Sequence, residues 1–207
     1  MMMRWAVVSL LAVSTLVLIS AGWAQSQNPE LDSLTAQAPS AQARVEAFHA
    51  TLLEAMQVPL YADREALLAE PVLNMFDMPR IASVSLGRTW RSLDDMQKNR
   101  FLDLLGTLVV ATYADRFDSF SGQSFVTREV REARRGMVVQ TELHKSDGDM
   151  VSLDYFLTAG KIFNVVADGV SDVSLRRADY NSIIKQHGYE ALLTHLEEKI
   201  AQARGGA

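Results

Sequence analysis

The chain has 207 residues, enough for one domain with a sizeable core, and its 48% apolar and 22% charged residues are typical of an ordinary globular protein. Its formal net charge of -5 argues against nucleic-acid binding, which needs a basic surface. The absence of cysteine excludes disulfides, thiolate nucleophiles and cysteine-ligated zinc or iron–sulfur clusters.

The first 24 residues have the pattern of a cleaved secretory signal. Arg4 supplies a basic start, the run from Trp5 to Ser20 carries no charge, and Gly22 and Ala24 stand at small-x-small spacing. The sequence therefore predicts a signal peptide over residues 1–24 and a secreted mature chain that begins at the following glutamine. A membrane anchor is the alternative, although the run is slightly short for a span of about 20 residues.

The segment after the signal differs in composition from the rest of the chain. Residues 25–40 are polar, small and proline-bearing, which is typical of a flexible linker. Residues 41–204 are predicted to form a single domain, and no internal repeat divides them.

The first part of this domain has the periodicity of helices. Apolar residues at three- and four-residue steps predict a helix over residues 45–56, which Pro59 ends. A second helix is predicted over residues 65–73. A third is expected between a cap at Asp77 and a stop at Gly87.

The strongest helical pattern extends over residues 93–117. Ser92 and Asp95 resemble a capping box at its start. The middle of the helix is apolar on almost every side. Such a helix is either buried in a core or lines an apolar cavity.

The period changes to two after Gly122, which predicts strands. Asp147-Gly148 and Ala159-Gly160 are expected to form turns between them. The predicted strands occupy residues 125–132, 137–144, 151–157 and 163–167. Each strand has one apolar face, so they form a four-stranded antiparallel meander that buries one side. Helices over residues 179–187 and 189–203 end the chain.

These elements together predict an α+β fold. A curved four-stranded antiparallel sheet covered by helices makes a cone or half-barrel. If the helices do not fill it, the interior is an apolar pocket. The sequence leaves open whether the pocket is filled.

Residues that carry out catalysis or bind metals are not grouped in any known pattern. None of His49, His144, His187 and His195 has the i, i+4 partner of a helical metal site. No G-x-S-x-G, S-x-x-K or glycine-rich phosphate loop is present. We therefore expect no catalytic residue, no metal and no cofactor.

Two stretches resemble a known family. Residues 76–117 contain Phe76-Asp77, Leu86-Gly87, Trp90 and Thr112-Tyr113-Ala114, in the order of the periplasmic MlaC, or toluene-tolerance, lipid-shuttle proteins. Residues 161–200 resemble the same family through three further features: Gly169-Val170-Ser171, Tyr180 and Gly188-Tyr189. The segment VVADGVSD is most similar in sequence to the hopanoid-associated HpnM branch. Ile162-Phe163 departs from the tryptophan that many members carry before the last strand, which puts the cargo in doubt.

The resemblance implies an NTF2-like cone with the acyl tails of a lipid in its pocket. It also implies a periplasmic carrier that shuttles a phospholipid or hopanoid between membranes. Its partners would be an inner-membrane ABC-type transporter, an outer-membrane protein, or both, without nucleic acid.

The wall of such a pocket is expected to come from the long helix, the helix before it and the strands. The candidate lipid-binding residues are Val84, Leu86, Phe101, Leu105, Leu108, Val109, Tyr113, Leu153, Tyr155, Phe163 and Val165. The alternative is that these residues form an ordinary core.

Two other functions stay open at this point. An adaptor subunit that docks to membrane hopanoid-biosynthesis enzymes would have a filled core and no extractable lipid. A small enzyme would have ionisable groups inside the pocket. Asp154 and Asn164, the polar residues among the apolar strands, alternate away from the apolar face and disfavour the enzyme.

Overall fold

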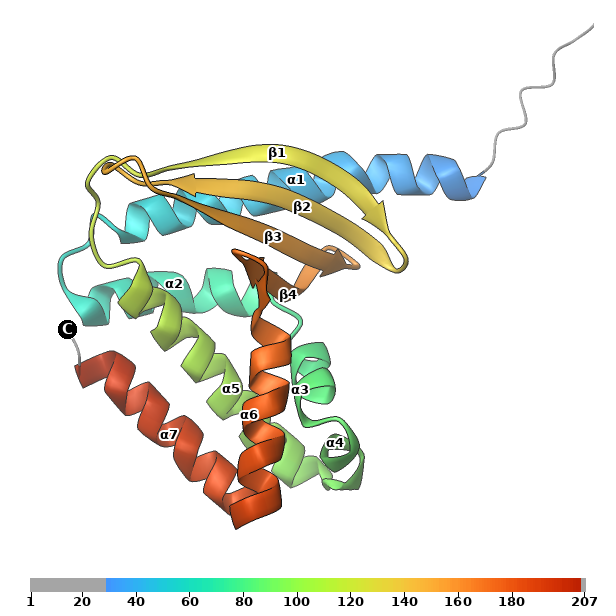
Figure 1. Ribbon diagram of the computed structural model, residues 1–207, viewed down its shortest axis with the longest axis vertical. Coiled ribbons are helices and arrows are strands. Elements are labelled where there is room, and N and C mark those ends of the chain that lie inside the picture. Colours follow the sequence, from blue (N-terminus) through green and yellow to red (C-terminus); the bar gives the residue numbers. More distant parts are fainter. Residues whose placement is uncertain (1–28, 206–207) are drawn as a thin grey trace, which may run out of the picture.

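The structure is a computed structural model that describes residues 29–205, with side chains from residue 41 onward (Figure 1). The helices are α1 (Pro29–Ala55), α2 (Tyr61–Met75), α3 (Met78–Leu86), α4 (Arg88–Ser92), α5 (Asp95–Arg116), α6 (Asp172–His187) and α7 (Tyr189–Gly205). The strands are β1 (Ser124–Ala133), β2 (Gly136–His144), β3 (Met150–Thr158), β4 (Lys161–Ala167) and β5 (Val170–Ser171). None of the helices in this part of the chain is long and apolar enough to span a bilayer.

Two predictions concern the start of the chain. The signal predicted over residues 1–24 lies outside the described residues. The linker predicted over residues 25–40 overlaps α1, which begins at Pro29. Proline is tolerated in the first turn of a helix, where its missing N–H has no intrahelical partner, so it does not prevent this earlier start.

The caps predicted for α3 are confirmed. Asp77 Oδ1 accepts a hydrogen bond from the backbone N–H of Arg80 at 3.1 Å, and Gly87 ends the helix at φ +58°. α2 begins four residues before and ends two residues after the predicted range of residues 65–73, and Pro71 lies inside the helix without ending it.

The capping box of α5 lies two residues later than predicted. Asp94 Oδ1 accepts from the Gln97 N–H at 2.8 Å, and Gln97 Oε1 accepts from the Asp94 N–H at 3.0 Å. Ser92 instead ends the short helix α4, where its hydroxyl donates to the carbonyl of Thr89. The prediction placed the box at Ser92 and Asp95 because α4 itself had not been predicted.

The sheet has five antiparallel strands in the order β1-β2-β3-β4-β5, and not four. The fifth is the two-residue β5, which turns back along β4 after Asp168 and Gly169. Ser171 then caps α6, its hydroxyl accepting from the Ser174 N–H at 3.3 Å. This cap explains why α6 begins at Asp172, seven residues before the predicted start at residue 179.

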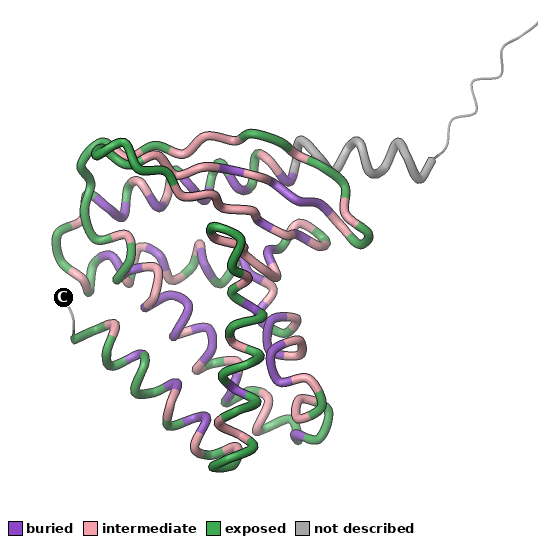
Figure 2. Tube along the Cα trace, in the orientation of Figure 1, coloured by how far each residue is buried: buried purple, intermediate pink, exposed green. Residues whose placement is uncertain are grey.

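The sheet and α1 form one end of the molecule, and α5, α6 and α7 form the other (Figure 1). The buried residues lie mainly on the inner sides of these two parts of the molecule (Figure 2). Arg64 of α2, which is only 3% exposed, connects the end of α5 with the segment that follows α1. It donates to the carbonyls of Ala114, Val58 and Pro59 at 2.9–3.0 Å. These bonds satisfy a buried guanidinium and the end of α5 together.

Candidate functional site

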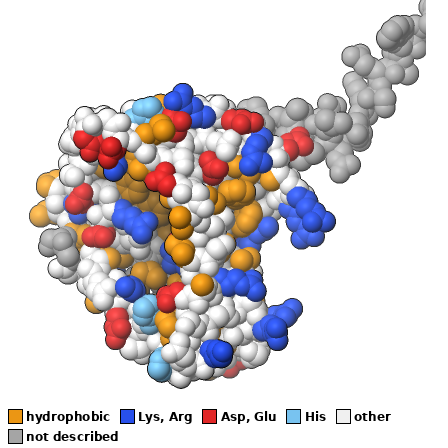
Figure 3. Space-filling view, viewed as in Figure 1, with side chains coloured by type: hydrophobic (Ala, Val, Ile, Leu, Met, Phe, Trp, Pro, Cys, Tyr) orange, Lys and Arg blue, Asp and Glu red, His pale blue; other side chains and the backbone are white. Residues whose placement is uncertain are grey.

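A cavity of about 560 Å³ lies between the sheet, α3, α5 and α6. In the space-filling view, hydrophobic side chains gather in a hollow on this side of the molecule, with basic side chains beside it (Figure 3). Its volume lies within the usual range of small-molecule sites. Its apolar and aromatic lining residues are Met56, Phe76, Ile81, Val109, Tyr113, Phe117, Leu143, Val151, Leu153, Tyr155, Val165, Ala167, Val170 and Leu175.

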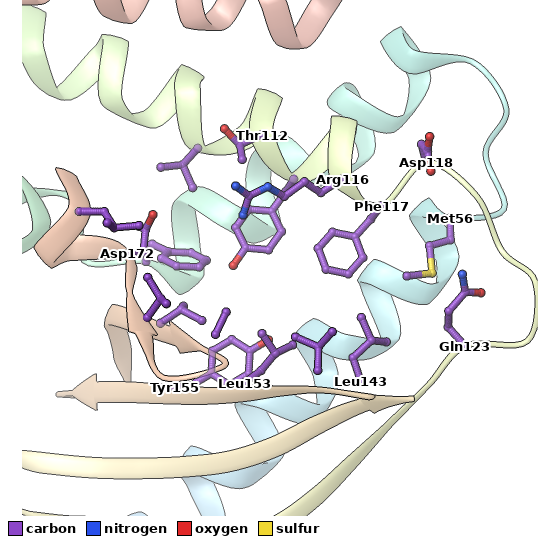
Figure 4. Close-up of a pocket in the computed structure, with 18 of the residues that line it drawn as sticks. Met56, Thr112, Arg116, Phe117, Asp118, Gln123, Leu143, Leu153, Tyr155 and Asp172 are labelled. Carbon is purple, nitrogen blue, oxygen red and sulfur yellow. The ribbon is translucent and has the colours of Figure 1, made fainter. Parts of the chain in front are cut away.

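The sheet supplies its wall through strand alternation. Leu143 pairs with Val151, and Tyr155 pairs with Val165, so that these side chains share one face. Leu143 and Tyr155 point from the sheet into the cavity, toward Phe117 at the end of α5 (Figure 4).

Polar side chains that bond to one another lie on the opposite face of the sheet. Gln140 donates to Asp154 at 3.0 Å, and Arg128 donates to Glu142 at 2.7 Å. Asn164 accepts from the Val173 N–H, at the start of α6. The prediction that Asp154 and Asn164 turn away from the apolar face is therefore confirmed.

Aromatic rings form the inner end of the cavity around Tyr113. The Tyr113 ring lies 5.4 Å from Phe48, 5.6 Å from Phe76 and 5.6 Å from Phe117, measured between centroids. Burial raises the pKa of Tyr113 and of Tyr155 above that of an exposed tyrosine. Both phenols are therefore uncharged at neutral pH.

His49 of α1 is held against the same wall. Its Nε2 lies 3.0 Å from the Tyr155 hydroxyl, and its ring stacks on Phe125 with centroids 3.9 Å apart. Burial lowers the pKa of His49 to about 4, an effect that the nearby Glu46 carboxylate partly opposes. The imidazole is therefore neutral at pH 7 and adds no charge to the cavity.

Five charged residues line the cavity. Three of them come from α5 and α6. Arg176 donates to Asp172 at 2.8 Å and to the Tyr180 hydroxyl at 3.2 Å, so it is held in place. Arg116 points into the cavity from α5 and has no ion-pair partner among the described residues (Figure 4). Lys145 and Asp118 are the remaining charged residues of the lining.

This distribution limits the chemistry of the site. In residues 41–205, no group of three or more histidine, aspartate or glutamate side chains is placed to hold a metal. Most of the lining residues are aliphatic or aromatic, and the charged ones come from the end of α5, the first part of α6 and the segments that follow α5 and β2. Such an arrangement suits an apolar ligand with a charged end.

The structure divides the candidate wall residues into three groups. Val109, Tyr113, Leu153, Tyr155 and Val165 line the cavity. Leu86, Phe101 and Leu105 do not line it and are fully buried in the core. Val84, Leu108 and Phe163 also do not line it and lie elsewhere on the helices and the sheet.

Aromatic contacts define the environment of two of these six, Phe101 and Phe163. The aromatic edges of Trp90 and Tyr180 meet Phe101, which places it between α4, α5 and α6. Phe163 lies under the Arg80 guanidinium, 4.0 Å from ring centroid to Cζ. A bulge at Phe156 and Leu157 changes the register of β4 there. Strand alternation counted through this bulge assigns Phe163 to the wrong face.

Several lining residues were not predicted. Leu143, Val151 and Ala167 follow from the same period of two as Leu153, so the sequence carried a signal for them. Met56 and Phe76 directly follow α1 and α2, and Ile81 lies within α3; the helical period makes Met56 and Ile81 core candidates but does not show that they face a cavity. Arg116 of α5 and Arg176 of α6 lie sixty positions apart in the sequence, and only the folded chain brings both to the same cavity.

The fold and the cavity define a class: α+β domains in which an antiparallel sheet and helices enclose an apolar cavity of ligand size. The model of one family, described as MlaC protein, matches residues 46–198. Because this match includes well over half of the sequence, the protein belongs to the MlaC family.

A solved structure has the same fold. It is the phospholipid-binding protein from Ralstonia solanacearum in complex with a phospholipid, 21% identical, with a TM-score of 0.68. The match covers 79% of this chain and 98% of that one. A search of curated proteins found no match. The family resemblance is confirmed, while the hopanoid-associated branch stays a prediction.

Proposed function

We propose that this protein is a periplasmic carrier that holds the acyl chains of a phospholipid in the cavity between the sheet, α5 and α6. The observation that carries the proposal is the cavity itself, with its mainly aliphatic and aromatic lining and a few charged residues. Membership of the MlaC family supports it, as does the likeness to a fold that holds a phospholipid in the Ralstonia protein.

The physical basis of binding is the burial of hydrocarbon. Each methylene removed from water contributes about 0.8 kcal/mol, so ten buried methylenes contribute about 8 kcal/mol before the cost of ordering the chain. Binding of this strength requires a partner for release. We propose that an inner-membrane ABC-type transporter, an outer-membrane protein, or both, open or compete for the cavity.

The two other functions considered from the sequence are less well supported. An adaptor with a filled core would have no such cavity. An enzyme would place ionisable groups beside the bound substrate, whereas most of the residues that line this cavity are aliphatic or aromatic. A hopanoid is the alternative cargo, since its rigid apolar body could also occupy an apolar cavity.

The test is lipid extraction from protein expressed with its own N-terminal segment and purified from the periplasm without detergent. Mass spectrometry of the organic extract is expected to find a diacyl phospholipid in near-stoichiometric amount. A hopanoid in its place would change the cargo and keep the carrier. Protein that reaches the periplasm folded, yet contains no lipid and takes up none from phospholipid vesicles, would overturn the proposal.

A further inference from the structure

A second groove opens beside the cavity, between α5, α6 and α7. Its volume is about 550 Å³. Five residues line both spaces: Thr112, Arg116, Asp172, Leu175 and Arg176. The cavity and the groove therefore adjoin at these five residues.

The lining of the groove is much more polar than the interior of the cavity. It includes three carboxylates, Asp115, Asp172 and Asp179, and three cations, Arg116, Arg176 and Lys199. The balance of charge distinguishes the groove from a binding site for a highly charged anion.

Some of these charges are already paired within the groove. Arg176 donates to Asp172 at 2.8 Å, and His195 Nε2 lies 3.3 Å from Asp179. Among the described residues, Arg116, Lys199 and Asp115 have no ion-pair partner. Two cations and one carboxylate are therefore available to a ligand. Arg116 stands at the junction of the two spaces.

We propose that the groove holds the headgroup of the lipid whose acyl chains occupy the cavity, and that it favours a zwitterionic headgroup of the phosphoethanolamine type. This inference rests on the proposed function. Arg116 and Lys199 supply positive charge for the phosphate, and Asp115 supplies negative charge for the ammonium group. A bare phosphate monoester leaves Asp115 without a partner and most of the groove unfilled.

The headgroup interaction is expected to select among lipids more than to add affinity. The groove is open to solvent, where charge pairs contribute about 1 kcal/mol or less. Discrimination between two lipids with identical tails depends on this difference alone, because the burial of the tails is the same for both. About 1 kcal/mol corresponds to a preference of roughly fivefold.

The experiment measures the ratio of two lipids bound in competition. Delipidated mature protein is equilibrated with equimolar dioleoylphosphatidylethanolamine and dioleoylphosphatidic acid, and the bound lipid is extracted and quantified by mass spectrometry. The wild type is expected to prefer phosphatidylethanolamine by roughly fivefold. Ala203→Trp places a large ring in the groove from α7 and is expected to abolish that preference.

A matched control lies two residues away on the same helix. Ala201 is exposed and lines neither space, so Ala201→Trp is expected to keep the wild-type ratio. Lys199→Glu provides a second variant at an exposed position that folding tolerates easily. It leaves the groove open and places a carboxylate where a cation stood. It is therefore expected to raise the phosphatidylethanolamine ratio further, because the new carboxylate repels the more highly charged phosphate of phosphatidic acid and attracts the ammonium group.

The total lipid bound per protein separates the two proposals. If neither the wild type nor any variant binds lipid, the carrier function itself fails. If all bind lipid and the ratio is the same in the wild type, Ala203→Trp and Lys199→Glu, the headgroup does not occupy the groove and the inference is wrong. If circular dichroism shows that Ala203→Trp is unfolded, the ratio for Lys199→Glu decides.

Discussion

Tryptophan substitutions at Val109 and Leu105 would have opposite consequences if the cavity exists as described. Both residues lie on α5, one helical turn apart, and both are nearly inaccessible, at 5% and 0% exposed. Val109 lines the cavity, whereas Leu105 belongs to the core and lines no part of it. Each variant therefore serves as the control for the other.

The magnitudes follow from the surroundings of each side chain. A tryptophan at Val109 projects into a cavity of about 560 Å³, so the free energy of unfolding of the lipid-free protein should change little. A tryptophan at Leu105 meets close-packed neighbours and should cost roughly 1–3 kcal/mol. For a domain of this size, that cost lowers Tm by about 2–12 °C.

Lipid binding should change in the opposite sense. The ring at Val109 occupies the space of the acyl chains, so Val109→Trp should lose lipid. Leu105→Trp should retain it wherever the variant folds. Bound lipid at about 100 times its Kd stabilises the wild type by about 2.7 kcal/mol, so addition of lipid should raise the Tm of wild type and Leu105→Trp only.

The assay is thermal melting of delipidated protein with and without added phospholipid, alongside lipid quantification by mass spectrometry. A large loss of Tm for lipid-free Val109→Trp, with its lipid binding intact, would refute the reasoning. That result would mean that Val109 is core, and the lipid would have to bind elsewhere.

Three further predictions concern acid stability, a turn and the mature N-terminus. The pKa of His49 is about 4 in the folded protein against 6.5 unfolded, so the unfolded state takes up a proton first as the pH falls. The free energy of unfolding should therefore decrease by on the order of 3 kcal/mol between pH 7 and pH 4. Denaturant titrations should find a smaller decrease for His49→Gln. An equal decrease in the wild type and the variant would contradict the lowered pKa of His49. Gly136→Ala should lower the free energy of unfolding by roughly 3 kcal/mol or more, because φ is +124° and a Cβ would collide with the backbone carbonyl of Leu157. Gly148→Ala, also at positive φ but in open space, should lower it by about 1 kcal/mol. Equal Tm values for the two variants would argue against the turn geometry. Intact mass of the native protein should correspond to a chain that begins at or near Gln25, and a membrane-bound protein with residues 1–24 still attached would show an anchor instead.

Local chemistry explains which elements the sequence could predict. Asp77 and Gly87 fix both ends of α3 through hydrogen bonds and backbone geometry within a few residues. The Asp147-Gly148 turn and the break at Gly188 are likewise properties of short segments, and both appear where expected. The short elements α4 and β5 were missed, because five and two residues carry no measurable period.

The sequence alone determined that the middle of α5 is largely buried and that the strands have one apolar face. These are consequences of composition and period, since a helical segment with little polar surface must avoid water on most sides. The tertiary structure decided what each apolar side chain faces. Leu105 and Val109 are equally apolar, yet one packs in the core and the other borders the cavity. That difference depends on where distant elements pack against each other, as does the presence of Arg116 and Arg176 in one cavity. No local pattern of residues encodes how distant elements pack.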